Sequence, residues 1–152
     1  MCRIAFFPGS FYPITKGHED IVRRAIPMYE EIIVALGINS SKNYMFSFEQ
    51  RLKWMEDTFT DCPNIKVVSY EGLTIDACKK HNAQFILRGL RNSNDYEYEK
   101  SIAMMNQALA PNIETVYLNT RPEWAAISST IIRDIIKNQG NSAAFLASGV
   151  QL

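Results

Sequence analysis

Short apolar runs alternate with amphipathic segments along the chain. The apolar runs predict five strands, at residues 4–7, 32–36, 65–70, 85–87 and 113–118. The first two runs are continuous rather than alternating, which is typical of strands buried on both faces of a parallel sheet. Between the strands, apolar residues recur at helical spacing and predict five helices, at residues 17–28, 48–59, 73–81, 94–109 and 128–140.

Strands and helices that alternate in this way predict right-handed βαβ crossovers and a parallel sheet. No repeat, low-complexity tract or linker-like stretch interrupts the 152 residues, a common length for one domain. We therefore expect an α/β fold in which residues 1–152 form a single doubly wound domain around a five-stranded parallel sheet. Ser47 and Gln50 predict a capping box at the start of the second helix.

Composition narrows the choice of partners. The 16 basic and 16 acidic residues give a net charge of zero, whereas a general nucleic-acid binder usually has a basic excess. The three cysteines lack metal-ligand spacing, which fits a reducing compartment, and the N-terminal apolar run is too short for a signal peptide or a membrane span. We expect a cytoplasmic protein with no nucleic-acid partner, no membrane contact and no dedicated metal site.

Three polar segments follow predicted strands, at the edge where open parallel sheets bind ligands. The first, residues 8–18, has Gly9 for close backbone approach and Ser10 for a hydroxyl. Gly17 and His18 begin the next helix, whose free amides and dipole favour an anion. A histidine at this point could donate to a phosphate oxygen, although a plain turn with a surface histidine would use the same residues.

The second segment follows the fourth strand and contains Arg88 and Arg91. Their guanidinium groups match the oxygen geometry of a phosphate. Asp95 and Glu99 lie one turn apart on the next helix, where they could orient the arginines or bind nucleotide hydroxyls. An ordinary salt-bridge network on the surface would show the same pattern.

The third segment, residues 124–133, places the hydroxyls of Ser128, Ser129 and Thr130 at a helix start. One hydroxyl must cap the helix, and the surplus, together with the helix amides, suits a triphosphate. Lys42, in the loop after the second strand, is either a solvated charge or a phosphate ligand.

Two short motifs resemble the marks of a nucleotidyltransferase superfamily. Residues 15–18 (TKGH) match T/H-x-G-H, and residues 127–133 (ISSTIIR) match ISSTxxR. Residues 8–18 (PGSFYPITKGH) and 88–99 (RGLRNSNDYEYE) narrow the resemblance to the bacterial phosphopantetheine adenylyltransferase family. The resemblance runs from about residue 3 to residue 139, and residues 88–99 are its most specific part.

This resemblance implies a Rossmann-like nucleotidyltransferase fold and transfer of AMP from ATP to 4′-phosphopantetheine, which gives dephospho-coenzyme A and pyrophosphate in coenzyme A biosynthesis. It also implies Mg²⁺ carried with ATP, and a homohexamer. His18 would be the catalytic residue that stabilises the transition state. The acceptor would bind Ser10, Lys42, Thr74 and Arg88. ATP would bind Ser10, Phe11, His18, Gly89, Leu90, Arg91, Glu99, Trp124, Ala125, Ala126, Ile127, Ser128, Ser129 and Thr130.

The chain departs from the family pattern at two positions. Tyr12 stands where the family usually has Asp, and Thr74 stands where an apolar residue is common. The sequence leaves two other functions open. The chain could be another small-molecule nucleotidyltransferase, acting on nicotinamide mononucleotide or glycerol phosphate, or a nucleotide-binding module without turnover. Residues 88–99 argue against the first, and the presence of both His18 and the hydroxyl-rich helix start argues against the second.

Overall fold

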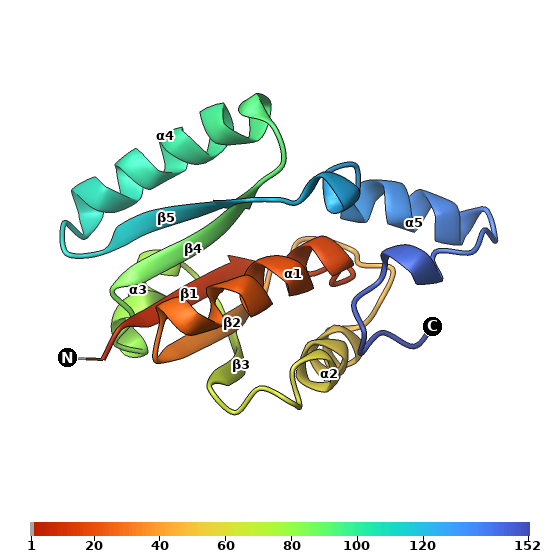
Figure 1. Ribbon diagram of the computed structural model, residues 1–152, viewed down its shortest axis with the longest axis horizontal. Coiled ribbons are helices and arrows are strands. Elements are labelled where there is room, and N and C mark those ends of the chain that lie inside the picture. The colour runs from red at the N-terminus through yellow and green to blue at the C-terminus, as the bar shows by residue number, and fades with distance from the viewer. Residues whose placement is uncertain (1) are drawn as a thin grey trace.

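Five parallel strands form one sheet in the order β3–β2–β1–β4–β5. The computed structural model describes residues 2–152 and confirms the predicted α/β fold with a five-stranded parallel sheet (Figure 1). Each predicted strand is present, with bounds that differ from the prediction by up to three residues at either end. The strands are β1 (Ile4–Gly9), β2 (Glu31–Gly37), β3 (Ile65–Tyr70), β4 (Phe85–Leu90) and β5 (Glu114–Asn119).

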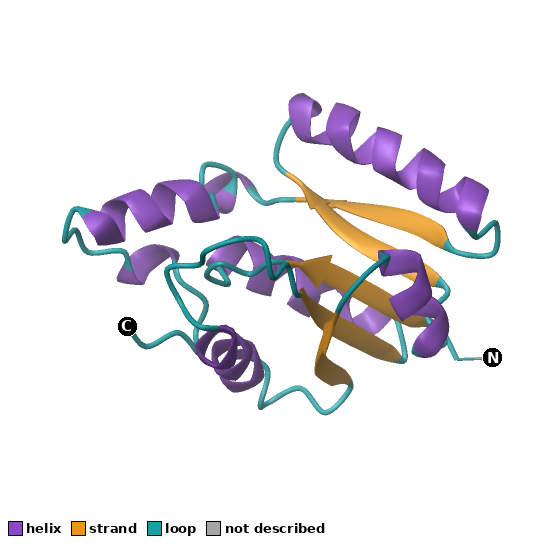
Figure 2. Ribbon diagram, turned by 180° about the vertical axis from the view of Figure 1, so that it is seen from behind, coloured by secondary structure: helices purple, strands orange, loops and turns teal. Residues whose placement is uncertain are grey.

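Helices cover both faces of the sheet, as predicted for a doubly wound fold (Figure 2). Phe6 and Phe7 follow one another in β1 and point to opposite faces, so each lies in a different core. One core contains residues of α1 (Lys16–Ala25) and α2 (Phe48–Thr58), and the other contains residues of α3 (Thr74–Lys80). The helices are α1 (Lys16–Ala25), α2 (Phe48–Thr58), α3 (Thr74–Lys80), α4 (Ser93–Leu109) and α5 (Ser129–Lys137), with 3-10 turns at Ile26–Met28, Pro122–Trp124 and Ala143–Phe145.

The order of the strands reverses between β1 and β4. The chain runs from β1 to β2 and β3 on one side of the sheet, and then returns to place β4 and β5 on the other side. Backbone pairing between β1 and β4 covers only Ala5–Phe85 and Phe6–Ile86, although β1 continues to Gly9. Ligands of open α/β sheets bind at such a reversal, beyond the carboxyl ends of the strands.

One helix cap differs from the prediction. The Ser47 hydroxyl accepts the Gln50 amide over 3.2 Å, but within residues 2–152 the Gln50 side chain makes no return bond to the Ser47 amide. The predicted capping box at this helix is therefore only half formed. A complete capping box forms at the start of α1, where Thr15 is the N-cap and His18 is its partner.

The apolar face predicted for residues 94–109 exists, but the chain does not bury it. Tyr98, Ile102, Met105 and Leu109 on α4 are all exposed, between 41% and 71%. In Figure 1, α4 lies along the β4–β5 edge of the sheet with one side open. In the part of the chain that the structure describes, no helix has the length and apolar character needed to cross a membrane.

Candidate active site

A cavity of about 330 Å³, which we call the His18 cavity, opens where β1 and β4 end. Its walls come from residues 7–11, 15, 17, 18 and 21, from residues 88, 89 and 91, and from residues 127–130, together with Asp95, Glu99, Thr120 and Trp124. These three stretches overlap the three polar segments that the sequence predicts as binding segments. The topology brings them together because β1 and β4 are neighbours and α5 begins beside both loops.

His18 is held at the floor of this cavity by the N-cap of its own helix. The Thr15 amide donates to His18 Nδ1 over 3.0 Å, and the Thr15 hydroxyl accepts the His18 amide over 3.3 Å. The ring packs edge-on to Phe11, with 5.1 Å between the ring centroids. Because Nδ1 accepts a hydrogen bond, the proton of the neutral ring lies on Nε2.

The surroundings of His18 keep its ring neutral. Burial lowers the pKa of His18, and the positive charges of Arg88 and Arg91 lower it further, to about 4. Near neutral pH the ring is therefore uncharged. It can donate one hydrogen bond from Nε2 to an anionic oxygen without adding a second positive group beside the two arginines.

The two arginines are oriented by carboxylates of α4, which is one of the two roles expected for those carboxylates. Arg88 donates to both oxygens of Glu99, over 3.0 and 2.6 Å, and its third nitrogen donates to the Pro8 carbonyl over 2.6 Å. Arg91 is paired in the same way with Asp95, at 3.1 Å. A surface salt-bridge network would explain these pairs, but it would not place Arg88 in the walls of three adjoining cavities.

The first turn of α5 forms another part of the wall, beside Arg91, which donates to the Ile127 carbonyl over 3.3 Å. The Ser128 hydroxyl caps the helix by accepting the Ile131 amide over 3.2 Å. Ser129 donates its hydroxyl to the Pro13 carbonyl over 3.1 Å, and Thr130 accepts from Arg133 over 3.2 Å. The surplus hydroxyls predicted from the sequence thus have partners within the chain, and the amides of this turn provide the donors that helix starts offer to phosphates.

Two further cavities share Arg88 with the first. One, of about 310 Å³, is lined by Ser10, Lys42, Tyr70 and Arg88 among other residues. The other, of about 150 Å³, is lined by Thr74 together with Arg88 and the surrounding parts of α4. The four residues expected to bind the acceptor therefore gather around one guanidinium group. A 3.0 Å hydrogen bond between Tyr70 and Thr74 links the walls of these two cavities.

Gly89 lies where α1 crosses closest to β4. A Cβ atom at this position would be 3.1 Å from Ile21 Cγ1, so the Ile21 side chain would have to move by a few tenths of an ångström. Ile21 follows His18 by almost one turn of α1 and also lines the His18 cavity. The glycine therefore allows the close approach of α1 to β4 that brings His18 near the arginines.

Most of the residues expected to bind ATP line the His18 cavity. Leu90, Ala125 and Ala126 do not, although each is a sequence neighbour of a residue that does. Sequence reasoning missed the Thr15 side chain, although its place before a helix identifies it as an N-cap. It also missed Thr120, whose position one residue after β5 could have indicated it.

Tyr12, the main departure from the family pattern, does not line the His18 cavity. Its ring packs against the guanidinium group of Arg133 at 4.3 Å and edge-on to Tyr44 at 4.7 Å, and its hydroxyl accepts the Met45 amide. Arg51 lies 5.7 Å from the same ring and donates to the Ser10 carbonyl over 2.9 Å. Packing around Tyr12 thus connects the loop of residues 8–18 to the loop that contains Lys42.

Comparison with known proteins agrees with this arrangement. Residues 6–135 match the cytidylyltransferase-like family model. The fold resembles a bifunctional NMN adenylyltransferase/ADP ribose pyrophosphatase from Francisella tularensis, with a TM-score of 0.76 and 19% identity over 99% of this chain and 46% of that one. It also resembles a putative nicotinate-nucleotide adenylyltransferase from Vibrio parahaemolyticus, with a TM-score of 0.70 and 15% identity over 96% and 94% of the two chains. The chain is a nucleotidyltransferase of the cytidylyltransferase-like family.

Curated relatives define the membership more narrowly. A phosphopantetheine adenylyltransferase from Flavobacterium psychrophilum is 51% identical over 150 residues, 99% of both chains. Enzymes of the same name from Bacteroides thetaiotaomicron and Lachnoclostridium phytofermentans are 43% and 40% identical, over 99% and 97% of this chain and 99% and 91% of their own. Within the nucleotidyltransferases, this chain belongs to the phosphopantetheine adenylyltransferases, as the sequence motifs predict.

Proposed function

We propose that this chain transfers AMP from ATP to the phosphate of 4′-phosphopantetheine, giving dephospho-coenzyme A and pyrophosphate. One observation carries the proposal beyond family membership. The His18 cavity adjoins two smaller cavities, and Arg88 lies in the walls of all three. Two phosphorylated ligands can therefore meet at one guanidinium group, beside a neutral hydrogen-bond donor.

In this arrangement ATP occupies the His18 cavity and the acceptor phosphate lies near Ser10, Lys42 and Arg88. An oxygen of the acceptor phosphate attacks the α-phosphorus of ATP, and the bond from that phosphorus to the bridging oxygen of pyrophosphate breaks. A phosphate monoester has a second pKa of about 6, so it is already largely ionised and requires no general base. The task of the site is in-line positioning and neutralisation of charge.

His18 and the arginines would divide that task. Nε2 of His18 would donate to a non-bridging oxygen of the α-phosphate, where negative charge is redistributed during attack. Arg91 and the first turn of α5 would hold the departing pyrophosphate. The remaining residues expected to bind ATP are Ser10, Phe11, Gly89, Leu90, Glu99, Trp124, Ala125, Ala126 and Ile127.

Magnesium fits this site as an ion carried by ATP. The carboxylates in the wall of the His18 cavity, Asp95 and Glu99, are already paired with Arg91 and Arg88. Within residues 2–152 there is no cluster of three His, Cys, Asp or Glu side chains placed to hold a metal. The ATP phosphates would therefore supply most of its ligands, and the ion would neutralise charge on the leaving group.

The exposed apolar residues of α4 support the homohexamer that the family resemblance implies. Tyr98, Met105 and Leu109 are more than half exposed, and a helix face of this kind is a common site of contact between subunits. The proposed setting is the cytoplasm, where the free cysteines Cys2, Cys62 and Cys78 would stay reduced.

The test is release of pyrophosphate from magnesium-ATP with a panel of acceptors. Phosphopantetheine should support turnover, whereas nicotinamide mononucleotide and glycerol phosphate should not. Comparable turnover with either rival acceptor would contradict the narrow assignment and leave the class of enzyme intact. ATP binding without any pyrophosphate release would instead support the nucleotide-binding module.

A further inference from the structure

The C-terminal segment of the chain returns to the helix that contains His18. Residues 141–150, which we call the strap, lie beyond residues 6–135, the part matched by the family model. The strap meets the residue before α1 through an isolated antiparallel bridge between Leu146 and Thr15. The Ala147 amide donates to the Ile14 carbonyl over 3.3 Å. Leu146 and Ala147 are buried, so this contact is part of the core.

Glu19, the residue after His18 in the sequence, binds the strap at a second point. Its carboxylate accepts the backbone amide of Ser148 over 2.8 Å and the Ser148 hydroxyl over 2.9 Å. The same carboxylate accepts Nε of Arg23 over 2.8 Å. Arg23 in turn donates to the Thr58 carbonyl of α2 over 2.8 Å. Glu19 therefore joins the strap to α1 and, through Arg23, to α2.

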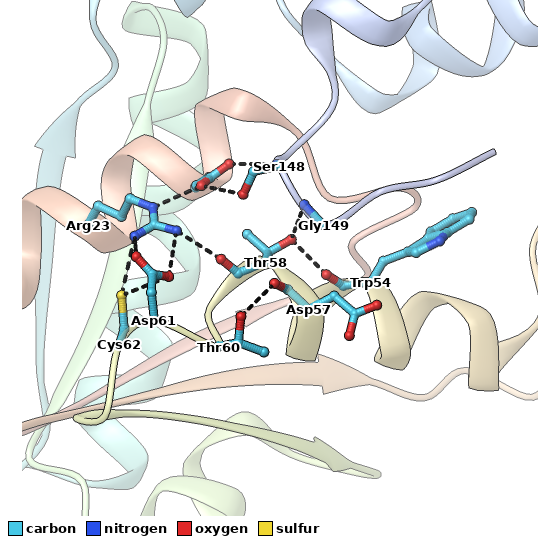
Figure 3. A network of polar contacts seen from close by, with 10 residues as sticks. Arg23, Trp54, Asp57, Thr58, Thr60, Asp61, Cys62, Ser148 and Gly149 are labelled. Carbon is cyan, nitrogen blue, oxygen red and sulfur yellow. Dashed lines mark hydrogen bonds and ion pairs between the residues drawn. The ribbon is translucent and has the colours of Figure 1, made fainter.

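The strap also has no room to move toward α2. The Gly149 amide donates to the Thr58 hydroxyl over 3.2 Å, and a Cβ atom on Gly149 would lie 2.3 Å from the Thr58 backbone nitrogen. Figure 3 shows Arg23, Thr58, Ser148 and Gly149 converging where α1, α2 and the C-terminal segment meet. The strap is thus fixed at both Thr15 and Glu19, the residues that delimit the first turn of α1.

His18 depends on that turn for its orientation. Its Nδ1 accepts the Thr15 amide, so a shift of Thr15 would alter both the direction of the ring and the atom that carries its proton. We propose that Glu19 is a positioning residue: by holding the strap at Ser148, it fixes the turn of Thr15 to His18 so that Nε2 of His18 faces the nucleotide. This inference rests on the proposed function for its kinetic consequence, but not for its structural one.

The first test replaces Glu19 with glutamine. Glu19→Gln keeps the size of the side chain, but its single carbonyl oxygen cannot accept all three hydrogen bonds. We expect kcat to fall by about tenfold, because a displacement of a catalytic group by about 1 Å can cost as much as 10²-fold in rate. The KM values for ATP and phosphopantetheine should change by less than about twofold, because the ligand contacts remain. Ser148→Ala, which removes one bond, should act in the same direction and more weakly.

Asp20→Asn is the matched control. Asp20 forms the same kind of i,i+4 pair with Arg24, at 3.0 Å, and it is the next residue on the same helix. It also pairs with Arg121 at 3.5 Å, and it has no bond to the strap. Asp20→Asn removes one negative charge near His18 and should lower the melting temperature as Glu19→Gln does. It should leave kcat within about twofold of wild type.

Nitrogen NMR of the His18 ring provides a readout that needs no turnover. In wild type near neutral pH, Nδ1 should give an unprotonated signal and Nε2 a protonated one. In Glu19→Gln the two signals should move toward each other, as the tautomers exchange. A wild-type enzyme that releases no pyrophosphate would contradict the proposed function, and the NMR comparison would still decide the role of Glu19.

Two results would overturn the inference. One is a Glu19→Gln variant that resembles Asp20→Asn in both kcat and the His18 ring signals, because the strap would then only stabilise the fold. The other is a double variant, Glu19→Gln with His18→Ala, whose kcat lies below that of His18→Ala by the same factor that Glu19→Gln alone shows against wild type. If Glu19 acts through His18, that double variant should lose less than about twofold relative to His18→Ala.

Discussion

Neighbouring residues determine the chemistry of each polar side chain in the site. His18 is a neutral donor because the Thr15 amide occupies its Nδ1 while burial and two positive charges lower its pKa. Arg88 is rigid because Glu99 and the Pro8 carbonyl together satisfy three of its donors. Such fixed donors stabilise a developing charge without reorganising first, and this is the main source of rate enhancement that the structure offers.

Removing the His18 ring should therefore affect the transition state more than the bound substrates. His18→Ala should lower kcat by about 10²–10³, the effect of deleting one preorganised donor. The affinity for ATP should change little, because the arginines and the start of α5 remain. Steady-state kinetics and calorimetric titration would measure the two quantities. A variant with full kcat would remove His18 from the mechanism.

The low pKa of His18 also predicts how stability depends on pH. Between pH 6.5 and 4 the unfolded chain protonates this histidine while the folded protein does not, so acidification favours unfolding. From pH 7 to pH 5 the wild type should lose about 2 kcal/mol more unfolding free energy than His18→Gln, which cannot titrate. Urea unfolding of both proteins at the two pH values would measure the difference. Equal losses would contradict the lowered pKa.

Arg88 and Arg91 should contribute to the binding of different ligands. Arg88 lines all three cavities, including the two on the acceptor side, whereas Arg91 lines the His18 cavity and neither of the other two. Arg88→Ala should mainly weaken phosphopantetheine binding, and Arg91→Ala mainly ATP binding, by about 1.5–3 kcal/mol for each charge-assisted contact. Calorimetry with both ligands on both variants provides an internal control. Equal weakening of both ligands in each variant would show one undivided basic patch.

At the scale of helices and strands, the sequence predicted the elements better than their contacts. The β1 and β2 runs are recognisable because burial on both faces leaves no polar alternation. The strand ends were less certain: Arg88 and Gly89 look like a loop, yet both pair with β5. The reason is that a polar residue at the carboxyl end of a strand can serve a binding site while its backbone stays in the sheet.

The residues of the candidate site also divide into those that the sequence predicts and those that only the tertiary contacts reveal. Residues at strand ends and helix starts could be predicted, because these positions have a general affinity for phosphate. The packing of Tyr12 between loops and the hold of the strap on Glu19 could not, because each joins residues far apart in the chain. The exposed face of α4 also escaped prediction, since helical periodicity identifies an apolar face without showing what covers it.

The cap of α5 allows a comparison between two helices. Ser128 and Ser47 each accept an amide three residues ahead, at 3.2 Å, but only Ser128 of the two lines the His18 cavity. Ser128→Ala and Ser47→Ala should each cost about 1 kcal/mol of stability, the usual loss of an N-cap. Only Ser128→Ala should also raise the KM for ATP. Thermal unfolding and kinetics on both variants would test this, and an equal rise in KM would contradict it.

At the scale of the whole molecule, the fold concentrates its polar groups at one edge of the sheet. The reversal of strand order brings β1, β4 and the start of α5 together, and the three cavities meet at Arg88. The strap contacts α1 at Thr15 and Glu19, on either side of His18 in the sequence. On the proposed function, two adjoining cavities would hold phosphorylated ligands, and α1 with the strap would support the donor between them.

The central claim is that an oxygen of the acceptor phosphate attacks the α-phosphorus of ATP. The most direct measurement uses phosphopantetheine labelled with heavy oxygen in its phosphate, followed by mass spectrometry of both products. All of the label should remain in dephospho-coenzyme A, and the released pyrophosphate should contain none. Heavy oxygen in the pyrophosphate, or a labelled acceptor recovered unchanged while ATP is consumed, would contradict the account.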